Sequence, residues 1–107
     1  MTYQKGYGCE IKDDDERVPI FQKQFEERGF DDTELWNLDQ TIIQFVYPRL
    51  KAFHEGYTCI PDQTAKMLKA FELMHEDIDK TIFDEQRGAI IKEGLQEFAD
   101  WFRALWN

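Results

Sequence analysis

The stretch DDTELWNLDQTIIQFVYPRLKAFHEG, residues 31–56, decides the fold. Its apolar side chains recur at steps of three and four residues, which places them on one broad face of a helix. The main stripe consists of Leu35, Leu38, Ile42, Val46, Leu50 and Phe53. A second stripe beside it consists of Trp36, Ile43 and Tyr47. Asp31, with Glu34 three residues later, forms a variant of the capping box that starts a helix. We therefore predict a helix that begins at Asp31, kinks near Pro48 and ends at Gly56.

Helical spacing also marks the segments on both sides of this stretch. A short amphipathic helix is expected over residues 20–28, and a longer one over about residues 61–79. A turn then precedes Asp84, which we expect to cap the last helix. The apolar face of that helix consists of Ile91, Leu95, Phe98, Phe102 and Leu105. Two glycines within it, Gly88 and Gly94, are candidates for close contact with another helix.

The first 20 residues differ from the rest of the chain. They contain glycines and the acidic run 13–16, and their apolar residues have no helical spacing, so we expect an irregular N-terminal arm over residues 1–20. Residues 21–107 are expected to form a single helical domain. The predicted fold is all-α: a compact bundle of three main helices, with one short N-terminal helix and the arm.

The balance of charge excludes several classes of partner. The 107 residues include 13 Lys and Arg and 22 Asp and Glu, which gives a formal net charge of -9. That charge repels phosphate backbones and anionic lipids, so we expect no nonspecific nucleic-acid binding. No apolar run approaches the roughly 20 residues that a membrane-spanning helix needs. We therefore expect no membrane association and a cytoplasmic protein.

Carboxylates repeat at helical spacing on the last two predicted helices. They are Glu72, Glu76 and Asp79, followed by Glu97 and Asp100. The paired pattern resembles that of all-α nucleoside triphosphate pyrophosphatases, in which carboxylates hold Mg²⁺ against a triphosphate. In so acidic a chain, such pairs also arise on an ordinary solvated helix face. We expect the solvated face, with no catalytic residue, no bound metal and no cofactor, and keep the pyrophosphatase as the alternative.

A small basic and aromatic group is the candidate ligand site. Arg49 and Lys51 would pair with the phosphates of a small nucleotide, while Tyr47 or Trp36 stacks on its base. The alternative is that these cations pair with the many surface carboxylates.

The aromatic side chains are a second candidate for binding. The chain contains 9 Phe, 4 Tyr and 3 Trp, which is a large number for a small helical core. Aromatic residues are favoured anchors at protein interfaces. We therefore expect Trp101 and Trp106 to contact a partner protein or a second subunit of a homo-oligomer.

Several strings in the chain occur together in one family of proteins. The most distinctive are LWNLD at residues 35–39 and PRLKAF at residues 48–53, and matching positions continue through residues 67–76 and 93–106. With these segments the chain resembles a family of small, uncharacterised proteins of tailed bacteriophages. The resemblance covers about two thirds of the chain and leaves out its first 28 residues. It implies a phage origin and carries no activity and no residue role.

These observations lead to one hypothesis and two alternatives. The hypothesis is a phage-derived, non-enzymatic binding protein with a host-directed, anti-defence role. It would act in the host cytoplasm by binding a host protein, with acidic side chains steering the encounter, or by sequestering a nucleotide signal. The alternatives are the Mg²⁺-dependent pyrophosphatase and a phage structural or assembly accessory.

Overall fold

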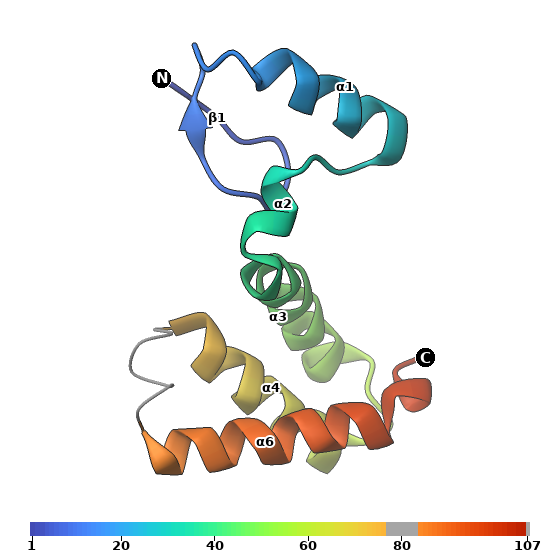
Figure 1. The fold of residues 1–107 in the computed structure, drawn as a ribbon. Coiled ribbons are helices and arrows are strands. Elements are labelled where there is room, and N and C mark those ends of the chain that lie inside the picture. Colours follow the sequence, from blue (N-terminus) through green and yellow to red (C-terminus); the bar gives the residue numbers. More distant parts are fainter. Residues whose placement is uncertain (77–83, 107) are drawn as a thin grey trace. The chain divides into compact units, whose positions relative to one another are not determined.

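The computed structural model describes residues 1–76 and 84–106, and helices make up most of them (Figure 1). This agrees with the predicted all-α class. The contacts divide the chain into two compact units, Met1–Ile42 and Ile43–Asn107, called unit 1 and unit 2 below. This boundary differs from the expected one after residue 20. The end of the helix predicted to reach residue 79, and part of the turn after it, lie outside the described residues.

Unit 1 begins with a small hairpin where an irregular arm was expected. Strand β1, Thr2–Tyr3, pairs antiparallel with strand β2, Ile11–Lys12. Helix α1, Val18–Arg28, follows and ends at Gly29, whose φ of 82° suits a left-handed helix cap. Strands of two residues are too short to produce an alternating pattern, so the sequence carries no signal for them.

A buried polar network starts helix α2, Thr33–Trp36. The Asp31 carboxylate accepts a hydrogen bond from the backbone N–H of Thr33 at 3.0 Å. The Glu34 carboxylate accepts one from the backbone N–H of Asp31 at 3.3 Å. The bond to Glu34 is the one expected of the predicted capping box, but the Asp31 carboxylate bonds the N–H two residues on instead of three. The N-cap of α2 is Asp32, and its side chain makes no capping bond. Asp31 and Glu34 are only 1% and 6% exposed, so their burial depends on such bonds.

The long predicted helix is interrupted at Asn37. This residue takes φ -130° and ψ 70°, and helix α3 then runs over Leu38–Gly56. The Thr41 hydroxyl donates to the Glu34 carbonyl oxygen at 2.7 Å and so satisfies a backbone group at the interruption. Pro48 lies inside α3 without ending it. The sequence pointed to a disturbance at Pro48, because a proline inside a helix removes a backbone hydrogen bond. The interruption at Asn37 is instead stabilised by tertiary contacts.

The hairpin of β1 and β2, together with its loop, packs against Asp31 and Glu34. The Tyr7 N–H donates to the Glu34 carboxylate at 3.1 Å, and the Tyr3 hydroxyl donates to Asp31 at 3.2 Å. Burial, followed by the hydrogen bond to Asp31, raises the pKa of Tyr3. A Cβ on Gly8 would lie 1.9 Å from a hydroxyl oxygen of α2. Only glycine therefore allows this close approach.

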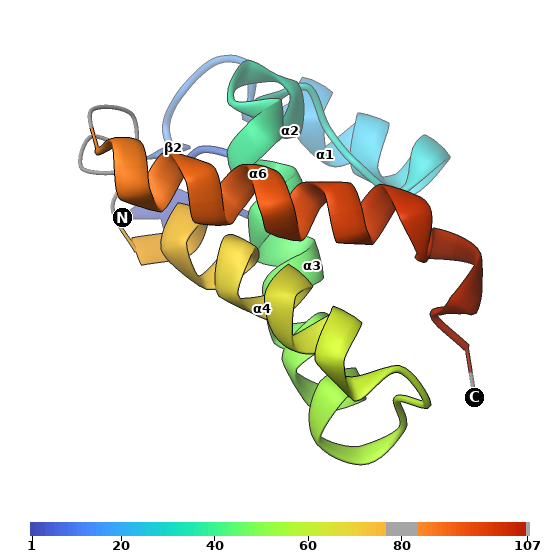
Figure 2. The same cartoon turned by 90° about the horizontal axis from the view of Figure 1, so that it is seen from below.

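Unit 2 contains helices α4, Pro61–Glu76, and α6, Glu85–Asp100, which lie side by side and run in opposite directions (Figures 1 and 2). They approach each other closely at Gly94. A Cβ on this residue would lie 2.4 Å from the Ala70 Cβ and 2.4 Å from the Lys66 carbonyl oxygen. Gly94 therefore makes the close helix contact that the sequence suggested.

The core of unit 2 joins α3 to this helix pair. Ile43 and Leu50 of α3 form a buried cluster with Met67 and Phe71 of α4. A short 3-10 helix, η1, follows α6 over Phe102–Ala104. Partly buried apolar side chains around the cluster are Val46, Tyr47, Ile60, Leu68, Met74, Phe98 and Leu105.

The start of α6 agrees with the prediction. The Asp84 side chain accepts a hydrogen bond from the backbone N–H of Arg87 at 3.0 Å. This bond satisfies one of the N–H groups that have no partner in the first turn of a helix. Glu85, in the same turn, places a further negative charge at the positive end of the helix dipole.

We predict that Gly94→Ala destabilises the protein by about 1–3 kcal/mol, because the added methyl group meets backbone on α4. Gly88→Ala is the matched control on the same helix, since no described atom lies within 4 Å of its added Cβ. That substitution is expected to stabilise the protein by about 0.5–1 kcal/mol, the usual gain in helix propensity. Urea unfolding of both variants measures the difference. Equal effects would contradict the close contact at Gly94.

We also predict an acidic titration at the start of α1. The Asp15 carboxylate accepts hydrogen bonds from the Arg17 side chain at 2.9 and 3.0 Å and from its backbone N–H at 2.9 Å. The Arg17 side chain lowers the pKa of Asp15 to about 2. Because the folded-state pKa is depressed, the stabilisation is present above the ordinary carboxyl pKa and is lost as pH falls toward 2. NMR titration measures this pKa, and Arg17→Gln should raise it toward the ordinary value.

Candidate functional site

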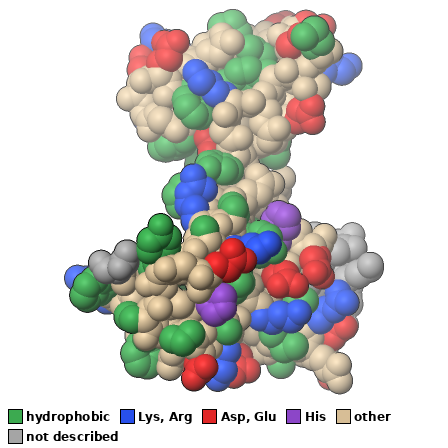
Figure 3. Space-filling model, turned by 180° about the vertical axis from the view of Figure 1, so that it is seen from behind, with side chains coloured by type: hydrophobic (Ala, Val, Ile, Leu, Met, Phe, Trp, Pro, Cys, Tyr) green, Lys and Arg blue, Asp and Glu red, His purple; other side chains and the backbone are tan. Residues whose placement is uncertain are grey.

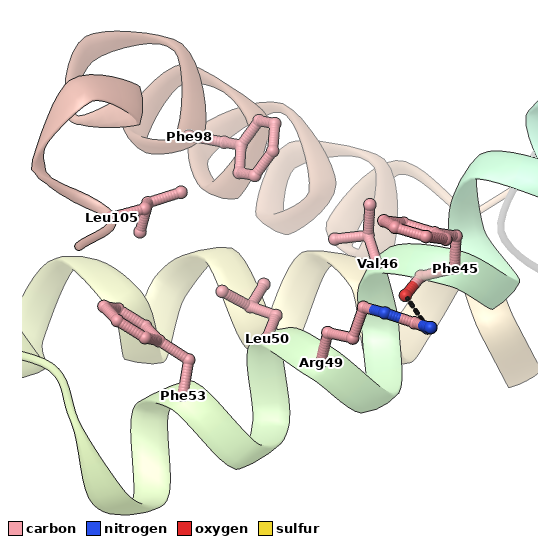
Figure 4. Close-up of a pocket in the computed structure, with 7 residues that line it drawn as sticks. All are labelled: Phe45, Val46, Arg49, Leu50, Phe53, Phe98 and Leu105. Atoms are coloured by element: carbon pink, nitrogen blue, oxygen red, sulfur yellow. Dashed lines mark hydrogen bonds between the residues drawn. The ribbon is translucent and has the colours of Figure 1, made fainter. Parts of the chain in front are cut away.

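An apolar groove in unit 2 is the candidate site (Figure 4). It has a volume of about 330 Å³ and opens to solvent. Clefts of a few hundred Å³ with apolar walls commonly hold ligands or the anchoring side chains of a partner. The residues that line it are Phe45, Val46, Arg49, Leu50 and Phe53 of α3, Phe98 of α6 and Leu105 after η1.

Helical spacing explains how α3 forms its side of the groove. Phe45, Arg49 and Phe53 are four residues apart and therefore follow one line along the helix. Val46 and Leu50 form the neighbouring line, which faces the core. Leu50 is 5% exposed and Phe45 is 48% exposed. The groove therefore extends from the buried cluster of unit 2 to the surface.

The Arg49 guanidinium is positioned by Phe45. Its Nη1 donates to the Phe45 carbonyl oxygen at 3.0 Å, and the guanidinium carbon lies 4.1 Å from the centroid of the Phe45 ring (Figure 4). A cation over an aromatic face is attracted by the negative potential of the ring. These two contacts fix a positive charge beside an apolar wall.

Phe98 forms the opposite wall and links it to the core. Its ring contacts the buried ring of Phe71 at 5.4 Å between centroids and the ring of Phe102, which is 56% exposed, also at 5.4 Å. Trp101 and Trp106, the predicted partner contacts, are 40% and 70% exposed. They are adjacent in the chain to Phe102 and to Leu105, which lines the groove. Of these exposed aromatic side chains, the Phe102 ring is in contact with this wall.

The structure does not bring the residues of the predicted nucleotide pocket together. Arg49 lines the groove, but Lys51 is two residues away on the same helix and so lies about 200° around it, on another face. Tyr47 packs on the His75 ring at 4.8 Å between centroids and contacts the buried cluster. The spacing of Arg49 and Lys51 therefore cannot bring both cations onto one phosphate group from a single helix face.

Trp36, the fourth residue of that predicted pocket, belongs to unit 1. Its ring contacts the Phe21 ring at 5.8 Å, and the Arg17 guanidinium lies 5.3 Å from its centroid. Phe21 is 3% exposed. Trp36 thus covers the buried side of α1 and has a structural role in unit 1.

The described carboxylates of the predicted pyrophosphatase set do not converge. The Glu97 carboxylate lies 4.0 Å from Lys66 Nζ, which also contacts Glu93 at 3.1 Å. Lys66 is ten residues before Glu76 on α4, a separation of about 15 Å along the helix. Glu97 therefore lies near the opposite end of α4 from Glu76, where a shared Mg²⁺ is out of reach.

The other acidic residues of that set have separate partners or positions. Glu72 lies 3.7 Å from Lys69 Nζ, and Asp100 accepts a hydrogen bond from Gln96 at 2.9 Å. Asp79 lies outside the described residues. Within residues 1–76 and 84–106, no group of three or more His, Cys, Asp or Glu side chains has the geometry to hold a metal ion.

Surface charges on unit 2 are interspersed. Figure 3 shows basic and acidic side chains alternating over the face of this unit that it presents. The contact of Lys66 with Glu93 is one example, and the hydrogen bond to Glu93 raises the pKa of Lys66. Such exposed pairs contribute little to stability and do not form a single charged site.

Sequence reasoning missed the groove as a site, although it identified most of its apolar residues. The helical pattern places Val46, Leu50 and Phe53 on the buried stripe, and Phe45 lies in neither stripe. The available signal was the four-residue step between Phe45 and Arg49, which predicts a cation stacked on a ring. That signal does not reveal whether another helix covers the pair.

No family model, curated protein or solved structure matches the chain. None of the described helices combines the length and the apolar character needed to cross a bilayer. Function is therefore inferred from the groove itself.

We predict that substitutions at a buried and at a half-exposed residue of the groove differ in their cost to stability. Leu50→Ala should destabilise the protein by about 2–5 kcal/mol, because Leu50 is 5% exposed and belongs to the core cluster. Phe45→Ala should cost about 1 kcal/mol or less, because almost half of this side chain is already in water. Thermal and urea unfolding measure both values. A larger cost for Phe45→Ala would show that this side chain is needed mainly for folding.

Proposed function

We propose that the chain is a phage-derived, non-enzymatic helical protein that binds a host protein in the host cytoplasm and thereby counters a host defence. The observation that carries this proposal is the open apolar groove of unit 2, with Phe45 half-exposed at its edge. The exposed Trp101 and Trp106 extend the surface that a partner would cover. The resemblance to small phage proteins supports the origin.

The chemistry of the groove favours a protein partner over a nucleotide. Phosphate groups are bound by several converging donors, such as clustered Arg and Lys side chains or backbone N–H groups. The groove is lined by apolar side chains and Arg49, and Lys51 lies on another face of α3. Interface cores are apolar and rich in aromatic residues, and binding energy concentrates in a few anchored side chains.

The proposal includes a closed three-helix arrangement of α3, α4 and α6. Support comes from the buried cluster, in which Ile43 and Leu50 of α3 meet Met67 and Phe71 of α4 while Phe98 of α6 packs at its edge. In such a bundle the helix positions fix the groove walls, and a preformed groove loses less entropy on binding.

Affinity purification of the tagged chain from a phage host bacterium tests the proposal. We expect one or a few host proteins to be retained by the unaltered chain and lost with Phe45→Asp, because a carboxylate at the groove edge opposes apolar contact. Ile90→Asp is the matched control: Ile90 is 38% exposed on α6 and does not line the groove.

Circular dichroism establishes that both variants remain folded. Retention of the same partners by Phe45→Asp, or their equal loss with Ile90→Asp, would exclude the groove as the binding surface. Nucleotide hydrolysis by the purified chain with Mg²⁺ would overturn its non-enzymatic character.

A further inference from the structure

We infer that the N-terminal hairpin of unit 1 is a charge-sensitive latch, which a negative charge on the Tyr3 phenol oxygen releases from α2. The hairpin consists of β1, β2 and the loop that joins them, residues 2–12. The inference concerns unit 1 alone and goes beyond the function proposed for the groove of unit 2.

Two buried carboxylates hold the hairpin in place. Asp31 is 1% exposed and Glu34 is 6% exposed. The Tyr3 hydroxyl donates to Asp31 Oδ2 at 3.2 Å, and the Tyr7 backbone N–H donates to Glu34 Oε1 at 3.1 Å. An ionised carboxylate can only accept hydrogen bonds, so both contacts depend on a donor that the hairpin supplies.

The Tyr3 hydroxyl is the one of these two donors that can become an anion. A phenol gains a negative charge by losing its proton or by carrying an anionic ester such as phosphate. Either change removes the hydrogen that Asp31 accepts and leaves two like charges in contact at a site that water hardly reaches. The charge of Glu34 also acts on Tyr3 and adds to the repulsion.

The titration of Tyr3 gives the direction of the effect. Burial, followed by the hydrogen bond to Asp31 and the charges of Asp31 and Glu34, raises the pKa of Tyr3. Because the folded-state pKa is raised, the stabilisation is complete below the ordinary tyrosine pKa of about 10 and is lost as pH rises above it. At neutral pH, with an unmodified phenol, the latch is therefore closed.

The other contacts of the hairpin explain why it should detach as one piece. Tyr3 pairs with Ile11 across the two strands, and the Cys9 N–H donates to the Thr33 carbonyl oxygen at 3.4 Å. A two-stranded hairpin has little stability of its own in water. Once the contact at Tyr3 is lost, the remaining contacts of residues 2–12 with α2 are therefore weakened together.

Phosphotyrosine incorporated genetically in place of Tyr3 tests the latch at neutral pH in the full chain. We expect amide hydrogen exchange at Tyr7 and Cys9 to accelerate about tenfold or more, while exchange in α4 and α6 stays within about twofold. Phosphotyrosine in place of Tyr57 is the matched control. Tyr57 is 60% exposed in unit 2, so the same added charge should leave exchange in the hairpin unchanged.

An alkaline titration of the unaltered chain tests the same latch without an ester. Above the ordinary tyrosine pKa, the ring signals of Tyr3 and the methyl signals of Ile11 should shift together in NMR spectra. The methyl signals of Ile43, which is buried in unit 2, serve as the reference. Tyr3→Phe should abolish the shift of Ile11, because a phenyl ring cannot ionise.

Each arm has a result that would contradict the latch. Unchanged exchange at Tyr7 and Cys9 with phosphotyrosine at position 3 would overturn it, and so would a shift of Ile11 that persists in Tyr3→Phe. Release by Tyr3→Phe as complete as that by phosphotyrosine would show that the lost hydrogen bond, and not the charge, is responsible. Release by phosphotyrosine but not by alkali would assign the effect to the bulk of the ester. Loss of protection in α4 and α6 at the same time would show global unfolding and also exclude the latch.

Discussion

The contact between α4 and α6 at Gly94 determines the arrangement of unit 2. Because no side chain separates the helices there, Ala70 and the Lys66 carbonyl lie directly against the α6 backbone. The helices are then close enough for the rings of Phe71 and Phe98 to meet edge to face. Phe71 is buried, so this contact holds Phe98 from the core side. One wall of the groove is thus a consequence of the distance between two helices that a single glycine allows.

Unit 1 depends on buried carboxylates as well as on apolar packing. Asp31 accepts hydrogen bonds from Thr33 and Tyr3, and Glu34 accepts them from Tyr7 and Asp31. A buried carboxylate without partners would cost several kcal/mol, so the N-terminal loop and the start of α2 stabilise each other. The loop does not merely cover α2, because it supplies donors that the sequence of α2 lacks. An acidic, glycine-containing segment therefore has a structural role that its composition alone does not suggest.

Local interactions could be predicted from the sequence, and interactions between distant segments could not. The bond between Glu34 and Asp31 and the cap at Asp84 depend on residues within one turn, so their spacing predicts them, although the N-cap of α2 is Asp32 and not Asp31. The interruption at Asn37 involves a tertiary hydrogen-bond network, and the hairpin strands are too short to show a pattern. For the site, the sequence pattern pointed to Arg49, which lines the groove. It paired Arg49 with Lys51 by proximity in the chain, although a helix turns two such neighbours to different faces.

The groove combines residues that stabilise the fold with residues that the fold does not need. Leu50 is already buried, so most of its apolar surface contributes to folding. Phe45 retains almost half of its surface in water, and removing that surface from water remains a source of free energy for association. Arg49 lies on the Phe45 ring and so shields part of it while it adds a charge. The same contact therefore reduces the apolar surface that the groove edge exposes to water.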